Sequence, residues 1–426
     1  MGPDPAALFS IHGVEIEYMI VDVDALDVEP VCDGLFEAVA GEPVDEIPRG
    51  PVAWSNELAA HVLELKTAHP VPSLSGVAAD LQASVADANA LLGDFGARLM
   101  PGSMHPWMDP QRELRLWPHG QRDVYRAYDR IFGCRGHGWA NLQSVHLNLP
   151  FATDAEFVRL HTVLRHLMPV LPTLAASSPV ADGRETGFAD FRMEVYRHNA
   201  DRMPEMTGLL VPEPVGSIAE YRERILEPLY RALAPHDRAG VLRHEWANSR
   251  GVIARFERDA LELRVLDVQE RPAADLAVLA LIVAVLRALA EERFAPASAL
   301  LALDTRRLAA LCFDAIREGD ALRIDDATWL GTFGLPARRT WARDFWGALL
   351  DRCDDLLAAS GVDLSPAETI LDRGTLASRL RAALGPPPPA EGAPGAAPPP
   401  WPRDRLRAVW RDLADCLAED RPFEGV

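Results

Sequence analysis

The sequence predicts an α+β fold in which a mainly antiparallel sheet forms a cup and helices cover the outer face of the sheet. Three observations support this class. Strand-like segments and amphipathic helical segments are interspersed without a regular strand–helix period. No strand-like segment is followed by a Gly-x-Gly-x-x-Gly or Walker-type loop, which disfavours Rossmann and P-loop folds. Four strand-like segments carry functional polar residues on one face and apolar residues on the other.

The first of these segments, residues 11–22, carries the most informative pair of side chains. Alternation with a period of two puts Glu15 and Glu17 on one face and Val14 and Ile16 on the other. Two carboxylates about 7 Å apart on one side of a strand repel each other unless water, a base or a cation lies between them. A divalent cation is the simplest counter-charge, so the pair predicts a metal site.

Three later strand-like segments, 61–67, 144–149 and 261–267, repeat this arrangement, and the last pairs with 252–257 through a turn at 258–259. The polar residues that they would add to the cup are Glu64, Lys66, Ser144, His146, Asn148, Glu262 and Arg264. Mg²⁺ and Mn²⁺ prefer carboxylate oxygen, with an occasional imidazole for Mn²⁺, and leave positions open for phosphates. Arginine neutralises phosphoryl charge that metals do not reach. A cup of this composition suits a metal-bound polyphosphate.

Helical periodicity and composition predict the remaining organisation. Helices are expected at 74–92, 154–168, 218–233, 273–293 and 340–358, and the apolar stretch 276–286 is too short to span a bilayer, which predicts a buried helix. Residues 385–402 contain nine prolines and predict a polyproline linker. We therefore expect a catalytic domain at 1–384, the linker at 385–402, and a tail at 403–426 whose amphipathic helix, 403–419, docks on the domain.

Charge and cysteine content restrict the partners and the compartment. The 426 residues carry a formal net charge of −20, which disfavours nonspecific binding to nucleic acid or anionic membranes. Five scattered cysteines, without a Cys-x-x-Cys pair, indicate neither a zinc site nor a disulfide framework and fit a reducing cytoplasm. The amino terminus lacks the features of a signal peptide, so we expect a cytoplasmic protein. A homo-oligomer stays open.

Six short motifs occur in order along the first two thirds of the chain: Gly13-Val-Glu-Ile-Glu17, Val62-Leu-Glu-Leu-Lys-Thr67, Gly102-Ser-Met-His-Pro106, Ser144-Val-His-Leu-Asn148, Ser177-Ser-Pro179 with the stretch 183–192, and Glu262-Leu-Arg-Val-Leu-Asp267. In these motifs the chain resembles the type-2 glutamate–cysteine ligase family. That family consists of ATP-dependent carboxylate–amine ligases with a glutamine synthetase/guanido kinase-like catalytic fold. Ser144 and Phe188 depart from the family pattern, which has His and Tyr there, and these departures concern the acceptor substrate more than the ATP chemistry.

The resemblance implies roles for the cup residues. Mg²⁺ or Mn²⁺ ions that hold ATP would be ligated by Glu15, Glu17, Glu64, His146 and Glu262. Glu262 and Arg264 would be catalytic, with Arg264 on the transferred phosphoryl group. Contacts to ATP or substrate would come from Arg192, Arg184, Ser144, Asn148 and Lys66. Each residue also has a plainer interpretation: a solvated strand face for the acids, a core position for His146, an ion pair for Arg264, and surface positions for Arg184 and Arg192.

Four other polar residues are not given a role in the reaction. His105 lies in a Gly/Pro turn, where it either stabilises the loop or belongs to the site. His161 and His166 are five residues apart on one helix, a spacing that does not suit a shared zinc ion, so we expect packing or surface roles. Glu57 is expected at the entrance of the strand that carries Glu64.

The implied reaction is ATP-dependent amide formation. The γ-phosphate would pass to a carboxylate, by resemblance that of the glutamate side chain. An amine, cysteine or another amino acid, would attack the acyl phosphate, and ADP and phosphate would be released, as in glutathione biosynthesis. This chemistry needs no side-chain nucleophile. Two alternatives remain: phosphoryl transfer to a guanidino or amine group without ligation, and a non-catalytic nucleotide-binding regulatory protein.

Overall fold

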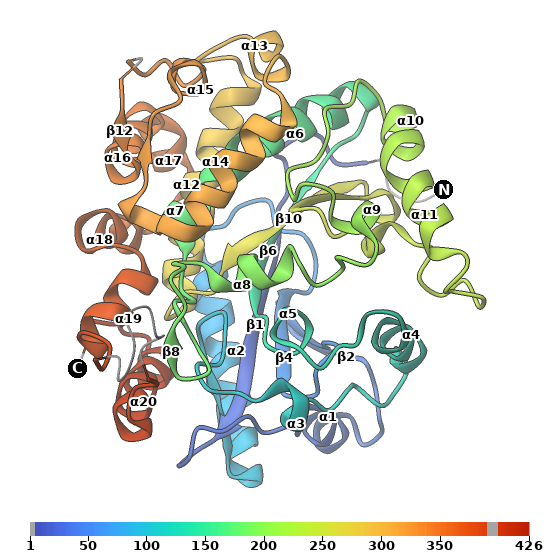
Figure 1. Cartoon of the computed structure of the whole chain (residues 1–426), viewed down its shortest axis with the longest axis vertical. Coiled ribbons are helices and arrows are strands. Elements are labelled where there is room, and N and C mark those ends of the chain that lie inside the picture. Colours follow the sequence, from blue (N-terminus) through green and yellow to red (C-terminus); the bar gives the residue numbers. More distant parts are fainter. Residues whose placement is uncertain (1–4, 337, 390–398, 426) are drawn as a thin grey trace.

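A computed structural model describes residues 5–336, 338–389 and 399–425, and its centre is an eight-stranded sheet (Figure 1). The strand order is β2-β3-β4-β1-β6-β10-β9, with β5 paired to the second half of β1, and every pairing is antiparallel. The strands of this sheet are β1 (Gly13–Asp22), β2 (Glu46–Arg49), β3 (Val52–Asn56), β4 (Val62–Thr67), β5 (Ala97–Met100), β6 (Ser144–Pro150), β9 (Val252–Arg255) and β10 (Ala260–Asp267). The α+β class and the antiparallel sheet are confirmed.

Helices and two small two-stranded sheets surround this sheet. The helices before residue 200 are α1 (Cys32–Ala40), α2 (Val77–Leu92), α3 (Pro110–Glu113), α4 (Arg122–Phe132), α5 (His137–Ala140), α6 (Asp154–Leu167), α7 (Pro172–Ala175) and α8 (Phe191–Tyr196). The later helices are α9 (Pro204–Thr207), α10 (Ile218–Tyr221), α11 (Glu227–Leu233), α12 (Pro272–Ala290), α13 (Ala297–Leu301), α14 (Thr305–Glu318), α15 (Ala327–Gly331), α16 (Ala342–Arg352), α17 (Asp354–Ser360), α18 (Ser365–Arg373), α19 (Leu376–Leu384) and α20 (Arg403–Glu419). The two small two-stranded sheets are β7 (Val180–Ala181) with β8 (Arg184–Glu185), which form a hairpin, and β11 (Arg323–Ile324) with β12 (Thr340–Trp341), which α15 separates along the chain.

The five predicted helices are present, with two changes in detail. The segment 218–233 forms α10 and α11 joined by a π-helical turn at Arg222–Leu226, and 340–358 divides into α16 and α17 at Cys353. At the start of α6 the Thr153 hydroxyl accepts from the Glu156 N–H at 3.2 Å, and the Glu156 carboxylate accepts from the Ala152 N–H at 2.8 Å. These two bonds satisfy backbone donors at the helix start; the first is that of a capping box, and the second reaches Ala152, one residue before the N-cap Thr153.

The register of the sheet brings the predicted polar residues to one face. Residues directly opposite in an antiparallel pair lie on the same side of the sheet. Glu17 on β1 is opposite Glu64 on β4, and Glu15 is opposite Lys66 on one side and His146 on the other. Asn148 on β6 is opposite Glu262 on β10. The polar faces of four strands therefore converge, as the alternation predicted.

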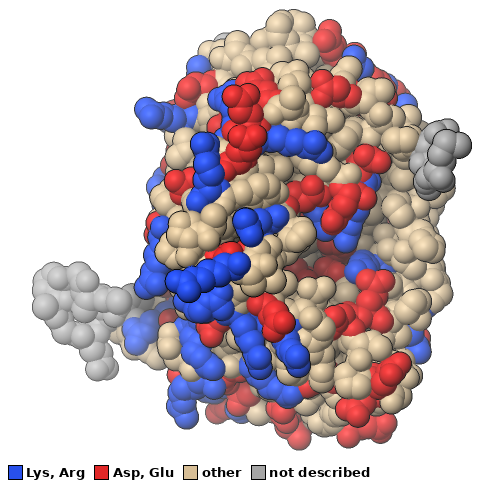
Figure 2. Space-filling model, turned by 90° about the vertical axis from the view of Figure 1, so that its right-hand side faces the viewer, with Lys and Arg blue, Asp and Glu red and all other residues tan. Residues whose placement is uncertain are grey.

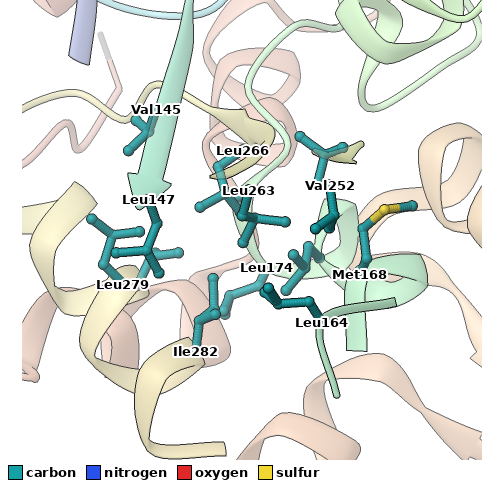
Figure 3. Packing of buried hydrophobic residues seen from close by; sticks show 14 of the residues in the cluster. Val145, Leu147, Leu164, Met168, Leu174, Val252, Leu263, Leu266, Leu279 and Ile282 are labelled. Carbon is teal, nitrogen blue, oxygen red and sulfur yellow. The ribbon is translucent and has the colours of Figure 1, made fainter. Parts of the chain in front are cut away.

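The opposite face of the sheet is the apolar core. Figure 3 shows Val145, Leu147, Leu263 and Leu266 of the sheet packed against Leu279 and Ile282 of α12. Leu164, Met168 and Leu174 from the α6–α7 region complete this layer. By length and composition α12 is the one helix of the described chain that could cross a membrane, but 83% of it is buried inside the molecule. The prediction of a buried helix at 276–286 is confirmed.

The carboxyl-terminal helix α20 has the bounds expected from its periodicity. Its apolar face, with Val409, Trp410 and Leu413, packs with Met19 of β1 and Met100 of β5. Burial of these side chains supplies the free energy that docks the helix. Residues 390–398 of the predicted linker lie outside the described residues, and the division into domain, linker and tail stays a prediction.

Candidate active site

A cavity of about 520 Å³ opens on the polar face of the sheet. Its walls come from the strands β1, β6, β9 and β10, from α4, α5 and α8, and from the segment that follows β3. Figure 2 shows a hollow on one face of the molecule, with acidic and basic side chains around it. A space of this size is within the range that small-molecule sites occupy.

Three carboxylates gather at one wall of the cavity, and two of them, Glu17 and Glu57, line it. The protein cations near this group are Lys66, 3.6 Å from Glu64, and His146, 3.9 Å from Glu17. Oxygens of Glu17, Glu57 and Glu64 lie within 4.8 Å of one another. Glu17 accepts a hydrogen bond from the Ser144 backbone N–H at 2.8 Å, and the Ser55 hydroxyl donates to Glu64. Burial, together with the neighbouring carboxylates, raises the pKa of Glu57 and of Glu64 to about 8, and burial also raises the pKa of Glu17. Such a group binds either protons or a cation.

A second group lies beside the first and contains a histidine. Oxygens of Glu15 and Glu64 and a ring nitrogen of His146 lie within 4.8 Å of one another. The His146 Nδ1 atom is 3.0 Å from Glu15 Oε2, and its Nε2 atom is 2.9 Å from the Ser144 hydroxyl. Burial disfavours the charged forms of both Glu15 and His146. The hydrogen bond to His146 and its charge nevertheless lower the pKa of Glu15 to about 2. The hydrogen bond to Glu15, together with the charge of Glu17, raises the pKa of His146 to about 9.

Two predicted contact residues flank these groups. The Asn148 side-chain amide donates to Glu15 at 3.2 Å. The Lys66 ammonium lies 2.8 Å from Glu46 and 3.6 Å from Glu64. Lys66 is therefore next to the acids, but its closest ionic partner is on β2, outside the cavity lining.

Glu262 is paired with arginines and belongs to neither of these two groups. Its two carboxylate oxygens accept from Arg255 Nη1 at 2.6 Å and from Arg264 at 2.9 Å. Burial favours the neutral acid, but Arg264 and Arg255 outweigh it and lower the pKa of Glu262. Arg264 also lines the cavity. The structure thus places Glu262 as the acid that holds two cationic side chains in position.

Arg192 is brought to the cavity, whereas Arg184 is not. Arg192 is buried, and its Nε donates to Asp267 Oδ1 at 2.5 Å. The other Asp267 oxygen accepts from the Ser177 backbone and the Ser178 hydroxyl, at 2.7 and 2.8 Å. Arg184 lies on the exposed β8 hairpin and is not among the residues that line the cavity.

A bulge in β10 explains why strict alternation did not place Asp267. Leu263 is opposite Leu147, but Leu266, three residues later, is opposite Val145, so β10 contains one extra residue. An extra residue reverses the parity of everything after it. Asp267 is consequently opposite Ser144 and on the polar face with Arg264. No local sequence signal indicates where a bulge of this kind occurs.

Glu57 corrects one expectation. We expected it at the entrance of the Glu64 strand because the two residues have opposite parity. The structure puts it at the end of the neighbouring strand β3, where Ser55 is opposite Glu64. Glu57 shares the parity of Ser55 and reaches the cavity two residues further on. Glu57 and Glu64 lie on either side of the turn between β3 and β4, so their odd and even positions in the sequence do not tell whether they share a face of the sheet.

Sequence reasoning also missed a second pair of arginines and an aromatic wall. Arg255 and Arg258 come from the β9–β10 hairpin, and Arg258 Nη1 is 3.4 Å from Glu15 Oε1. The predicted pairing of these two segments contained the signal for Arg255, since Ile253 is opposite Glu262 and Arg255 follows with the same parity. The side of the cavity away from the sheet is lined by Tyr125, Tyr128, Trp139 and Trp246.

The three other histidines singled out in the sequence, His105, His161 and His166, have packing roles. His105 Nε2 is 2.7 Å from the Leu26 carbonyl, and the His105 N–H donates to Asn141 at 2.6 Å, so this residue anchors its loop. The His161 ring is stacked on Phe157. His166 Nε2 is 2.7 Å from the Thr332 hydroxyl. All three are buried, and none lines the cavity.

The donor atoms on the acidic wall fit a divalent cation. Both groups offer carboxylate oxygens, and one adds an imidazole nitrogen, which is the ligand chemistry of Mg²⁺ and Mn²⁺. Burial first, and then repulsion between the carboxylates, raises the pKa values of Glu57 and Glu64, and a divalent cation would stabilise their charged forms. Arg192, Arg255, Arg258 and Arg264 line the same cavity and offer donors for an anion.

Known proteins have sequences related to this chain. An uncharacterized protein of Archaeoglobus fulgidus is 39% identical over 280 residues, which is 66% of this chain and 75% of that protein. A putative glutamate–cysteine ligase 2 of Jannaschia sp. is 27% identical over 217 residues. The match covers 50% of this chain and 51% of the Jannaschia protein, so the chain spans about half the length of that relative.

Solved structures with the same fold are also ligases. A glutamate–cysteine ligase of Francisella tularensis, in complex with AMP, superposes with a TM-score of 0.56 at 13% identity and covers 99% of this chain and 90% of its own. A bifunctional glutathione synthetase of Pasteurella multocida has a TM-score of 0.54 at 15% identity, covering 88% of this chain and 49% of its own. At such identities the likeness establishes the fold, and it confirms the predicted fold class.

The family itself is established by a match along most of the sequence. The description "Glutamate-cysteine ligase family 2 (GCS2)" matches residues 11–377, which include all the strands and helices that line the cavity. The chain therefore belongs to glutamate–cysteine ligase family 2, a family of ligases that form carbon–nitrogen bonds.

Proposed function

We propose that this protein joins the side-chain carboxylate of glutamate to the amine of cysteine or another amino acid, using ATP and releasing ADP and phosphate. The observation that carries the proposal is the arrangement of charges in one cavity. Three carboxylates gather at one wall with no arginine paired to them among the described residues, and four arginines line the cavity. The substrate carboxylate and ATP are both anions, so they approach each other only where cations offset their charge. The arginines supply such charge directly, and the carboxylates would supply it through a bound metal ion.

The reaction has two steps. A carboxylate oxygen attacks the γ-phosphorus of ATP, the bond from that phosphorus to the β–γ bridging oxygen breaks, and ADP leaves. The amine nitrogen then attacks the acyl carbon of the acyl phosphate. The carbon–oxygen bond breaks, phosphate leaves with the electron pair, and the nitrogen loses a proton as the amide forms. No side-chain nucleophile takes part.

The acidic wall would hold the metal. Glu17, Glu57 and Glu64 form one set of ligands, and Glu15 with His146 forms a second set beside it. Glu262 was predicted as a ligand by resemblance, and its position between Arg255 and Arg264 supports a role in orienting those arginines. A bound Mg²⁺ or Mn²⁺ would offset the charge of the triphosphate.

The arginines would hold the transferred group and the substrate. Arg264 is fixed by Glu262 and faces the cavity, so it is our candidate for the phosphoryl group in transit. Arg192 is fixed by Asp267, while its Nη2 has no hydrogen-bond partner among the described residues. A buried guanidinium nitrogen without a partner suits a substrate carboxylate or phosphate. Ser144 lines the cavity as a weaker contact, and Asn148 supports Glu15.

The proposal is tested by product analysis. The full chain is incubated with ATP, Mg²⁺ or Mn²⁺, glutamate and each amino acid in turn, and ADP and the condensed product are measured by mass spectrometry. We expect ADP and a γ-glutamyl amide in equal amounts. An acceptor that gains 80 mass units without amide formation, the ~80 Da of a phosphoryl group, would indicate phosphotransfer instead.

Variants test the site assignment. Glu17→Gln and Arg264→Ala should abolish turnover, because each removes a charge from the cavity wall. Glu223→Gln and Arg306→Ala are matched controls, since both residues are exposed and neither lines the cavity. Turnover that survives in the first two variants would refute the assignment. ATP binding without ADP release for any amine would favour a non-catalytic nucleotide-binding protein.

A further inference from the structure

A second cavity lies on the helix-covered side of the sheet. Its volume is about 160 Å³, and its walls come from α12, from α17, and from the segments on either side of the β-bridge between His12 and Val71. It shares no lining residue with the large cavity. This second cavity is therefore separate from the metal and arginine site described above.

The floor of this second cavity is apolar. Ala280, Val283 and Ala284 follow one another along one face of α12, and Phe9 and Leu356 face them from the other walls. Small alanine side chains on α12 create the space, because any longer side chain there would fill it. A cavity of about 150 Å³ with apolar walls accommodates a ligand the size of benzene. The space thus suits a compact apolar group of that size.

Polar groups at this cavity have unused hydrogen-bonding capacity. His12 is 7% exposed, and its Nδ1 atom is buried without a hydrogen-bond partner among the described residues. Leaving such a group unsatisfied costs about 1–3 kcal/mol. Arg287 lies one helical turn beyond Val283 on the same face of α12, and its Nε donates to Glu291 at 2.8 Å. Its two Nη groups make no hydrogen bond to the described part of the chain.

We propose that this second cavity is a binding site for a small carboxylate with an apolar body, such as a branched-chain or simple aromatic acid. The apolar body fills the space beside Ala280 and Ala284. The carboxylate accepts from the guanidinium of Arg287. A neutral ligand of the same shape leaves Arg287 without its partner, so charge and shape together select the ligand. The proposal is independent of the ligase reaction.

Calorimetric titration of the full chain with phenylacetate and 3-methylbutanoate tests the site, with benzyl alcohol as the neutral analogue. We expect saturable binding of the two carboxylates at one site and much weaker binding of the alcohol. Ala284→Leu fills the space and should abolish binding, whereas Ala79→Leu, on the exposed face of α2, should not. Arg287→Gln should weaken the carboxylates about tenfold and leave the alcohol unchanged.

Several outcomes would overturn the proposal. They are the absence of saturation in the millimolar range, binding that Ala284→Leu leaves intact, and equal loss of affinity in Arg287→Gln and in the control Arg306→Gln. Thermal denaturation verifies the fold of each variant. If Ala284→Leu does not fold, the Arg287 comparison decides alone, because Arg287 is an exposed residue whose replacement does not disturb the core.

Discussion

The two walls of the large cavity treat their carboxylates differently. On one wall Glu262 is held between two arginines, which lower its pKa against the effect of burial. At the other wall no arginine pairs with Glu57 or Glu64 among the described residues, Lys66 lies 3.6 Å from Glu64, and burial and repulsion raise the pKa of each acid to about 8. Arginines thus neutralise Glu262, whereas the acids at the other wall fit the bound cation that we propose. This difference divides the proposed site into a part that is preorganised by the chain and a part that would be completed by the metal.

The largest effect is expected from removing the protein's own counter-charge. In Arg264→Ala turnover should fall about a thousandfold or more, because the developing phosphoryl charge loses its donor. The free energy of unfolding should also fall by about 3–5 kcal/mol, since Glu262 is left buried with one partner fewer. Steady-state kinetics and chemical denaturation measure the two quantities.

The double variant Glu262→Gln/Arg264→Ala separates these two effects. It should recover most of the lost stability, because no unpaired carboxylate remains in the wall. It should not recover turnover. A double variant that regains activity would mean that Arg264 acts only by holding the fold together.

A substitution on the acidic wall should change the free energy of unfolding in the opposite direction to one on the arginine wall. In Glu64→Gln the metal-free protein should be more stable at pH 9, by on the order of 2 kcal/mol, because one member of a repelling group becomes neutral. Mg²⁺ affinity should fall at least tenfold, since even outer partners of metal ligands produce losses of that size. Glu262→Gln should instead destabilise the protein. If Glu64→Gln and Glu262→Gln changed the free energy of unfolding in the same direction, the distinction between the two walls would be contradicted.

The same contrast explains how far the sequence predicted the site. Glu15, Glu17, Glu64 and His146 were correctly placed on one face because alternation along an unbroken strand is a local property. Glu262 and Arg264 were placed on that face for the same reason, but their pairing with Arg255 depends on a neighbouring strand. Alternation and the predicted hairpin put Arg255 and Glu262 on one face but do not say whether an arginine or a metal ion neutralises the carboxylate, so the sequence alone could not distinguish a metal ligand from a partner of arginine.

The residues that were missed depend on register or on loops. Asp267 reaches the polar face only through the bulge in β10, and Glu57 only through the turn between β3 and β4. The aromatic wall around Tyr128 and Trp139 comes from α4 and α5, which periodicity did not reveal because α5 is one turn long. The fold class and the long helices were predictable, since each rests on many residues with one period.

The pH dependence of stability should differ between metal-free and metal-bound protein. The folded-state pKa values of Glu57 and Glu64, about 8, exceed the unfolded value of 4.5. As pH rises from about 4.5 to about 8, the unfolded state loses these protons first, so metal-free protein should lose stability over that window. Mg²⁺ should reduce the loss and bind more tightly as pH rises, with release of protons. Thermal denaturation from pH 5 to 9, in EDTA and in Mg²⁺, measures the difference.

A control variant identifies the acids responsible for this pH dependence. In Glu57→Gln/Glu64→Gln the metal-free protein should lose less stability between pH 5 and 8 than the unsubstituted protein does. Glu15 works in the other direction, because its pKa of about 2 lies below the unfolded value, and its contribution is lost only as pH falls from about 4.5 towards 2. Identical metal-free profiles for the double variant and the unsubstituted protein would show that ionisation of these two acids does not destabilise the fold.

The smallest effect is expected at the rim of the arginine wall. Arg258 is 48% exposed on its side chain and lies 3.4 Å from Glu15, whereas Arg264 is 19% exposed. Solvent-exposed pairs contribute about 0–1 kcal/mol, so Arg258→Gln should change the free energy of unfolding by less than about 1 kcal/mol. Its effect should appear in the KM for ATP and diminish with added salt, because exposed charges are screened. A loss of turnover as large as that of Arg264→Ala would mean that burial does not separate the two arginines, and that the rim belongs to the reacting centre.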